Sequence, residues 1–303
     1  MRPPPHLLLV CALIAAAAFA GCGGDKSSSE QPAEIEEQLG LSGSSPDAVQ
    51  RQTQVEGRIR DCMRAQGFEY TPVDPLARQA ALTGKARITD EEFIKQFGYG
   101  ISTLFGRGNA QADPNDRIRQ SLPAADRAVY DRALYGDTRI SFTEALDTGE
   151  FGDLGGCTKL ASDAAFGGGA VLLAVVGKLD ELDEGIVQDQ RMVKAVERWS
   201  ACMRDRGYRY PDADAIDTDL LERFQTIMGV GVRPGATSAL NSGTSYDPAA
   251  LTALQKEEVK IANADLACEQ REITSVEEVV RPQHERTFRQ QNKRLLDRVP
   301  PAS

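Results

Sequence analysis

Cysteine is the residue type in this chain whose spacing points most directly to chemistry. The chain of 303 residues has six cysteines, at positions 11, 22, 62, 157, 202 and 268. A cysteine directly after a short apolar segment is a candidate for lipid attachment, and paired cysteines in an oxidising compartment form disulfides. The first two cysteines lie in or directly after such a segment, which leaves four to pair with one another.

The N-terminus has the layout of an export signal. Arg2 lies near the start, an apolar run extends from Leu7 to Ala20, and Gly21 and Cys22 follow. As a helix the 14-residue run would cover roughly 21 Å, which is shorter than the roughly 30 Å hydrocarbon core of a bilayer. We therefore expect a signal peptide over residues 1–21 rather than a permanent transmembrane helix.

The segment from Phe19 to Cys22 resembles the lipobox of bacterial lipoproteins. The resemblance implies that Cys22 receives a diacylglycerol group, becomes the mature N-terminus and anchors the protein to the outer face of the cytoplasmic membrane. Phe19 departs from the Leu that is usual at its position. The alternative is ordinary cleavage after Ala20, which would release a secreted soluble protein.

Composition sets limits on the partners of the chain. Lys and Arg number 35 against 45 Asp and Glu, and the net charge is −10 at pH 7. Because an acidic chain repels phosphate backbones, we expect no nucleic-acid partner. Residues 22–45 begin with glycines and a run of serines, which is typical of a flexible tether.

One motif occurs twice in the mature chain. Its pattern is Cys-Met-Arg-x-x-Gly-aromatic-x-Tyr, at residues 62–70 and again at 202–210. Apolar residues recur at helical spacing before each copy. Gly67 and Gly207 stand where a left-handed residue ends a helix, so each motif predicts a helix C-terminus.

Each copy of the motif is followed by a second helical pattern and a second cysteine. Four cysteines allow three connectivities, and the repeat favours Cys62–Cys157 and Cys202–Cys268. Each bridge would contribute about 4 kcal/mol by closing a long loop. These elements predict an all-α fold of two disulfide-stapled helical units, because no convincing run of alternating strand residues occurs. The predicted boundaries place unit 1 at 46–166, a linking helix at 167–185 and unit 2 at 186–300.

The segment Ala262 to Cys268 adds a third feature to the lipobox and the repeated motif. Together they resemble a group of uncharacterised secreted lipoproteins of actinobacteria. The resemblance implies export and anchoring, and it supplies no activity that could be transferred to this chain.

Signatures of common enzymes are missing from the sequence. Outside the signal peptide the chain has one histidine, His284, which lies in an Arg- and Gln-rich helical pattern and is expected at the surface. Neither Gly-x-Ser-x-Gly, Ser-x-x-Lys, His-Glu-x-x-His nor a phosphate-binding loop occurs. Asp212, Asp214, Asp217 and Asp219 could hold Ca²⁺, but the segment lacks the glycine and closing Glu of an EF-hand, and an acidic start of a helix explains the four residues better. We expect no cofactor and no metal.

These features predict a lipid-anchored accessory or binding protein of the cell envelope without catalytic activity, whose partner is an envelope protein or a glycan. The alternative is a carboxylate-based hydrolase of envelope glycan or peptidoglycan. Such an enzyme would need two carboxylates about 5 to 10 Å apart in a cleft.

Overall fold

The computed structural model describes residues 35–41, 46–85, 88–105, 114–138, 140–142, 145, 150–229 and 246–301. Within these residues every regular element is a helix and no strand occurs, so the all-α prediction is confirmed. The predicted signal peptide, Cys22 and most of the predicted tether lie outside the described residues.

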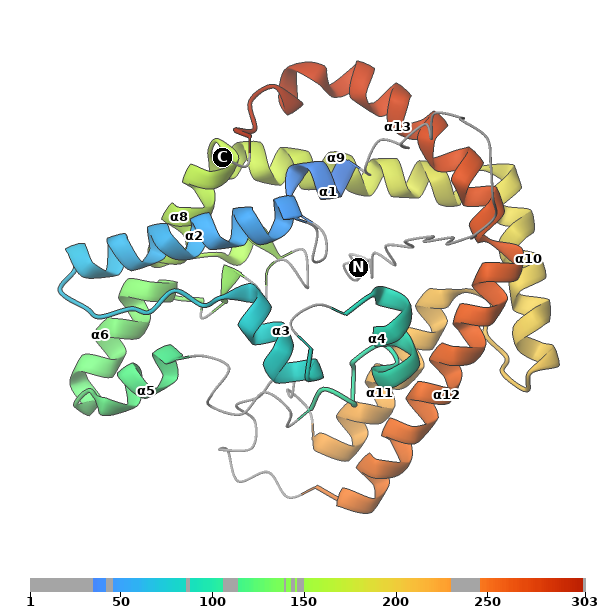
Figure 1. Ribbon diagram of the computed structural model, residues 1–303, viewed down its shortest axis with the longest axis horizontal. Coiled ribbons are helices and arrows are strands. Elements are labelled where there is room, and N and C mark those ends of the chain that lie inside the picture. Colours follow the sequence, from blue (N-terminus) through green and yellow to red (C-terminus); the bar gives the residue numbers. More distant parts are fainter. Residues whose placement is uncertain are drawn as a thin grey trace, which may run out of the picture.

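A first group of helices, which includes α2, α6 and α8, lies together on one side of the molecule (Figure 1). Its helix α2 packs along α8, and α8 also contacts α6. The apolar core between them includes Ile59, Met63, Tyr130 and Phe166. The elements of this group are α2 (Pro46–Ala65), α3 (Pro75–Thr83), α5 (Pro114–Ser121), α6 (Ala124–Tyr135), the 3₁₀ helix η1 (Phe151–Asp153) and α8 (Gly156–Phe166).

A second group of helices surrounds Cys202. The long helix α12 contacts α10, α11, α4 and α13, and the core between them includes Trp199, Met203, Phe224 and Ile261. The elements are α4 (Asp90–Phe97), α10 (Gln190–Asp205), α11 (Ala213–Met228), α12 (Pro248–Glu272) and α13 (Thr274–Leu296).

Helix α9 (Gly169–Val187) connects the two groups and runs along one edge of the molecule beside α13 (Figure 1). Its apolar residues serve both cores, since Leu172 belongs to the first cluster while Val171 and Val175 belong to the second. The helix occupies the segment in which the sequence predicts a linking helix, and it is an integral part of both cores.

Residues 88–105 differ from the predicted division of the chain. The sequence places them in the first unit, yet α4 packs on α12, and Ile101 and Phe105 belong to the second core. The buried carboxylate of Glu258 on α12 accepts hydrogen bonds from the backbone N–H groups of Ile101 and Ser102, each at 2.8 Å. Because buried N–H groups need such acceptors, this contact fixes the segment on the second group.

The described part of the predicted tether is also structured. Helix α1 (Ile35–Leu39) buries Ile35 and Leu39, which lie four residues apart on one helix face, in the core shared with α9. The prediction of a flexible tether to residue 45 is therefore wrong for residues 35–41, since an i, i+4 apolar pair can dock on a larger core.

Candidate binding groove between α9 and α13

The four cysteines among the described residues form the two bridges that the repeat favours. Cys62 pairs with Cys157 and Cys202 pairs with Cys268, with Cα–Cα distances of 5.6 and 5.7 Å. The first bridge joins the end of α2 to the start of α8, and the second joins α10 to α12. All four residues are therefore structural disulfide cysteines. The predicted lipidation residue Cys22 lies outside the described residues.

The repeated motif ends a helix in both copies. Gly67 and Gly207 have φ angles of 83° and 93°. The backbone N–H of Phe68 donates to the Met63 carbonyl at 3.0 Å, and the N–H of Tyr208 donates to the corresponding Met203 carbonyl at 2.9 Å. In both copies the motif therefore serves to end a helix.

The aspartates at the start of α11 have separate roles. Asp212 caps the helix by accepting from the Ala215 N–H at 2.9 Å, and Asp219 accepts from the Tyr210 hydroxyl at 2.8 Å. Burial raises the pKa of Asp217 to about 7. Among the described residues, no group of three or more His, Cys, Asp or Glu side chains is arranged to hold a metal ion.

Asp265 on α12 is a buried acid that joins helices. It accepts a hydrogen bond from the Tyr99 hydroxyl at 2.6 Å and one from the Trp199 indole N–H at 2.7 Å. Burial raises the pKa of Asp265, and the two donors oppose that rise. Its two hydrogen bonds fix the positions of Tyr99 and Trp199 relative to α12. Glu258 does the same for the turn after α4.

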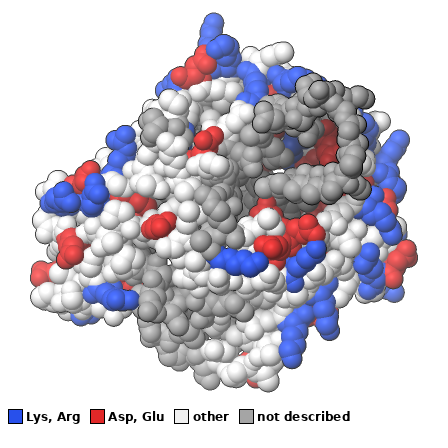
Figure 2. Space-filling model, in the orientation of Figure 1, with Lys and Arg blue, Asp and Glu red and all other residues white. Residues whose placement is uncertain are grey.

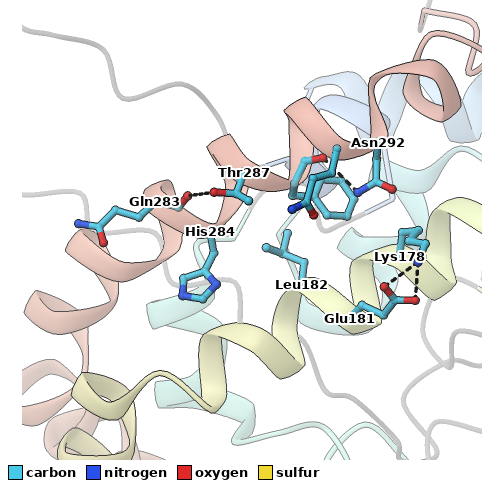
Figure 3. A pocket seen from close by; sticks show the side chains of 9 residues that line it. Lys178, Glu181, Leu182, Gln283, His284, Thr287 and Asn292 are labelled. Atoms are coloured by element: carbon cyan, nitrogen blue, oxygen red, sulfur yellow. Dashed lines mark hydrogen bonds and ion pairs between the residues drawn. The ribbon is translucent and has the colours of Figure 1, made fainter.

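The described part of the chain offers a groove of about 360 Å³ between α9 and α13. Leu182 and Phe288 are buried and form its apolar floor, while its walls are mostly uncharged polar side chains. Figure 3 shows His284 from α13 and Leu182 from α9 pointing toward the space between the helices. The lining residues are Lys178, Glu181, Leu182, Gln283, His284, Thr287, Phe288, Gln291 and Asn292.

His284 is half-buried in this groove instead of lying free on the surface. Its Nε2 is 3.3 Å from Asp189 Oδ2, and its ring packs over Gly185, where a Cβ would lie 3.5 Å from Nδ1. Asp189 also accepts from the side chain and the backbone N–H of Arg191. The Arg191 guanidinium hydrogen bond, followed by the backbone bond, holds the pKa of Asp189 well below its ordinary value.

The His284–Asp189 pair has no nucleophile beside it in the groove. The one hydroxyl among the lining residues belongs to Thr287, and it donates to the Gln283 carbonyl at 3.2 Å. Nucleophilic catalysis needs a hydroxyl or thiol that gives its proton to the imidazole. The arrangement can therefore orient the imidazole as a hydrogen-bonding group toward a ligand.

A buried ionic network fixes the two walls of the groove. Arg281 of α13 donates to Asp183 of α9 at 3.3 Å and to Glu277 at 2.9 Å. Glu36 of α1 is only 5% exposed, and neither of its carboxylate oxygens has a hydrogen-bond partner among the described residues. Burial raises the pKa of Glu36 and, together with the nearby charge of Glu36, raises the pKa of Asp183 to about 6.

The sequence contains one pattern that could have indicated the groove, a set of polar residues on one face of α13. Gln283, Thr287 and Gln291 recur every four residues and so lie on one face of α13, and His284 and Asn292 flank them. From sequence alone such a polar face cannot be distinguished from an ordinary solvent-exposed helix surface. It becomes part of a groove only when the opposite wall is known. That wall, Lys178 and Glu181 of α9, lies about a hundred residues earlier in the chain.

No single described helix is long and apolar enough to cross a membrane. Helices α8 and α9, which are bent by 71° relative to each other, meet the same length and hydropathy criteria when taken as a pair.

Comparison with known proteins adds no function to this geometry. No protein family, no curated protein and no solved structure matches the chain.

Proposed function

We propose that the protein is a lipid-anchored binding protein of the cell envelope whose α9–α13 groove binds glycan. The observation that carries the proposal is the hydrogen-bonding character of the groove. Gln291 presents an amide that can both donate and accept, as the hydroxyl groups of sugars do. Gln283 and Asn292 add amides that keep part of their capacity, since the Gln283 oxygen also accepts from Arg191 at 3.0 Å and the Asn292 N–H also donates to the Phe288 carbonyl at 3.0 Å. The buried side chains of Leu182 and Phe288 add an apolar surface on which a ligand can pack.

Charge also favours a neutral polar ligand. Figure 2 shows Lys and Arg interspersed with Asp and Glu on one face of the molecule. The net charge of −10 disfavours a polyanion. In the groove Lys178 pairs with Glu181 at 2.6 Å, so the two charges offset each other.

Glycan binding without cleavage agrees better with the lining than hydrolysis does. Glycoside cleavage requires a pair of carboxylates about 5 to 10 Å apart. Among the residues that line the groove, Glu181 is the one carboxylate, and Lys178 holds it. A hydrolase would have to use a second acid that the groove does not present.

Binding of soluble peptidoglycan fragments to the purified full-length protein tests the groove. We expect Gln291→Ala and His284→Ala each to weaken binding about fivefold, because one hydrogen bond contributes about 1 kcal/mol. Gln290→Ala is the matched control, since Gln290 is exposed on the same helix and outside the lining. Equal effects of the substitutions at 290 and 291, or a wild type that does not bind, would contradict the proposal.

Metabolic labelling with palmitate tests the anchor. The wild type is expected to take up label and to fractionate with the membrane, while Cys22→Ala should lose both properties. Cys11→Ala removes the other cysteine of the N-terminal segment and should label normally. Label on the Cys22→Ala protein, or its retention in the membrane fraction, would rule out lipid attachment at Cys22.

The two disulfides support an extracytoplasmic location, because such bonds persist in oxidising compartments. They do so whether the protein is anchored or secreted. The palmitate experiment separates these two forms.

A further inference from the structure

The two disulfides differ in how far solvent reaches them. Cys202 and Cys268 are 1% and 0% exposed, and Cys157 is 0% exposed. Cys62, at the end of α2, is half-buried. Of the four bridged cysteines, Cys62 is therefore the one with solvent exposure.

Cys157 is placed to leave as a thiolate when Cys62 is attacked. The side-chain N–H of Gln66 donates to Cys157 Sγ at 3.0 Å and makes a longer hydrogen bond of 3.7 Å to Cys62 Sγ. Cys157 is also the second residue of α8, whose N-cap Gly155 supplies no side-chain acceptor. Helix N-termini lower thiol pKa values, and a leaving thiol of low pKa departs faster.

The second disulfide lacks these features. Cys268 lies in the last two turns of α12, where the helix end carries partial negative charge. In the second copy of the motif Arg206 occupies the position of Gln66. In the described ranges no hydrogen-bond donor contacts the sulfur of Cys202 or Cys268, so the chain contains its own reference for the reactivity of the first bridge.

We propose that Cys62–Cys157 is a thiol-exchange site that accepts a low-molecular-weight thiol. The incoming thiolate attacks Cys62 Sγ, a new sulfur–sulfur bond forms there, and the electron pair of the broken bond leaves on Cys157 Sγ. Attack by the Cys157 thiolate on the mixed disulfide expels the small thiol and restores the original bond. Each step exchanges one sulfur–sulfur bond for another and needs no further oxidant or reductant.

The core between α2 and α8 keeps the opened site in register. Ile59 and Met63 of α2 and Ala161 and Phe166 of α8 belong to one buried cluster and hold the two helices together. The mixed disulfide can therefore form in a folded protein and close again. The proposal is independent of the glycan groove, which lies on other helices.

Graded exposure of the folded wild-type protein to reduced glutathione tests the site. After acid quenching, alkylation and peptide mass spectrometry, we expect the first disulfide to open at least ten times faster than the second. The glutathione adduct is expected on Cys62. Opening of Cys202–Cys268 at an equal or greater rate, or an adduct on Cys157, would overturn the proposal.

A matched pair of variants separates simple exposure from activation of the leaving group. Gln66→Leu removes the donor to Cys157 Sγ and should slow opening of the first disulfide several-fold. Arg206→Leu makes the same change at the corresponding position of the second motif and should leave both opening rates unchanged. If Gln66→Leu opens at the wild-type rate, Gln66 does not activate the leaving thiolate and that part of the proposal is wrong.

Discussion

At the scale of single residues, Glu269 of α12 is a half-buried carboxylate near the acids Asp265 and Glu277. Burial raises the pKa of Glu269 to about 8, and the charges of Asp265 and Glu277 raise it further. The pKa of Asp217 is raised to about 7, first by burial and then by the charge of Asp214. In the folded protein these groups hold protons at pH values where the unfolded chain has lost them.

Stability is therefore expected to fall as pH rises. The pKa of a glutamate in the unfolded chain is about 4.3, whereas the pKa of Glu269 in the folded protein is about 8. Between these two pH values the folded state binds more protons than the unfolded state. Raising the pH through this window therefore favours unfolding. Glu269→Gln keeps the neutral form and should reduce the loss in urea midpoint between pH 5 and pH 8.5. Glu222→Gln, at an exposed position on α11, is the control for charge removal. An unchanged pH dependence in Glu269→Gln would refute the assignment.

At the scale of elements, the repeated motif shows how a short sequence ends a helix in two settings. The same carbonyl, of Met63 or Met203, accepts from the aromatic residue five positions later. The aromatic rings then serve different cores, since Phe68 packs against Tyr130 while Tyr208 packs on the second cluster. The helix stop is local, and the packing around it is not.

Two glycines, Gly57 within α2 and Gly67 directly after its end, test this interpretation of the motif. A Cβ at Gly67 would meet nothing within 4 Å, so Gly67→Ala should cost only the left-handed backbone strain, about 1 kcal/mol. Gly57, in the middle of the same helix, also has open space around a Cβ and has no positive φ. Gly57→Ala should therefore stabilise the protein by about 0.5–1 kcal/mol. Chemical denaturation measures both, and shifts of the same sign would contradict the assignment.

At the scale of the whole molecule, the C-terminal segment returns to α2. Arg51 of α2 is 1% exposed, and its guanidinium donates to the carbonyls of Ala165 at 2.6 Å and Pro300 at 2.9 Å. It also lies 4.8 Å from the centre of the Phe166 ring. One buried cation thus ties α2, the end of α8 and the C-terminal segment together, and a Cβ at Gly167 would collide with the Arg298 carbonyl.

Replacing this cation should loosen the molecule as a whole. Arg51→Met fills similar space but leaves the Ala165 and Pro300 carbonyls without their donors, and we expect a loss of about 3 kcal/mol in unfolding free energy. Arg58→Met, at an exposed position on the same helix, should change stability by less than about 0.5 kcal/mol. Equal urea midpoints for the two variants would show that the buried contacts contribute nothing.

Local features of this protein follow from sequence alone. The helix ends before Gly67 and Gly207, and the absence of strands in the described ranges, agree with the sequence prediction. So does the disulfide pairing, because the repeat places one cysteine pair in each unit. Each of these depends on residues close together in the chain or on an internal copy.

Only the tertiary structure decided which segments share a core. In the folded protein residues 88–105 pack on α12, and α1 contributes to the same core as α9. His284 lies beside Asp189. Amphipathic helices of similar pattern can pack on either core, and the choice depends on buried partners such as the acceptor Glu258. The groove between α9 and α13 has the same origin, since its two walls come from distant parts of the chain and meet only when both helices pack.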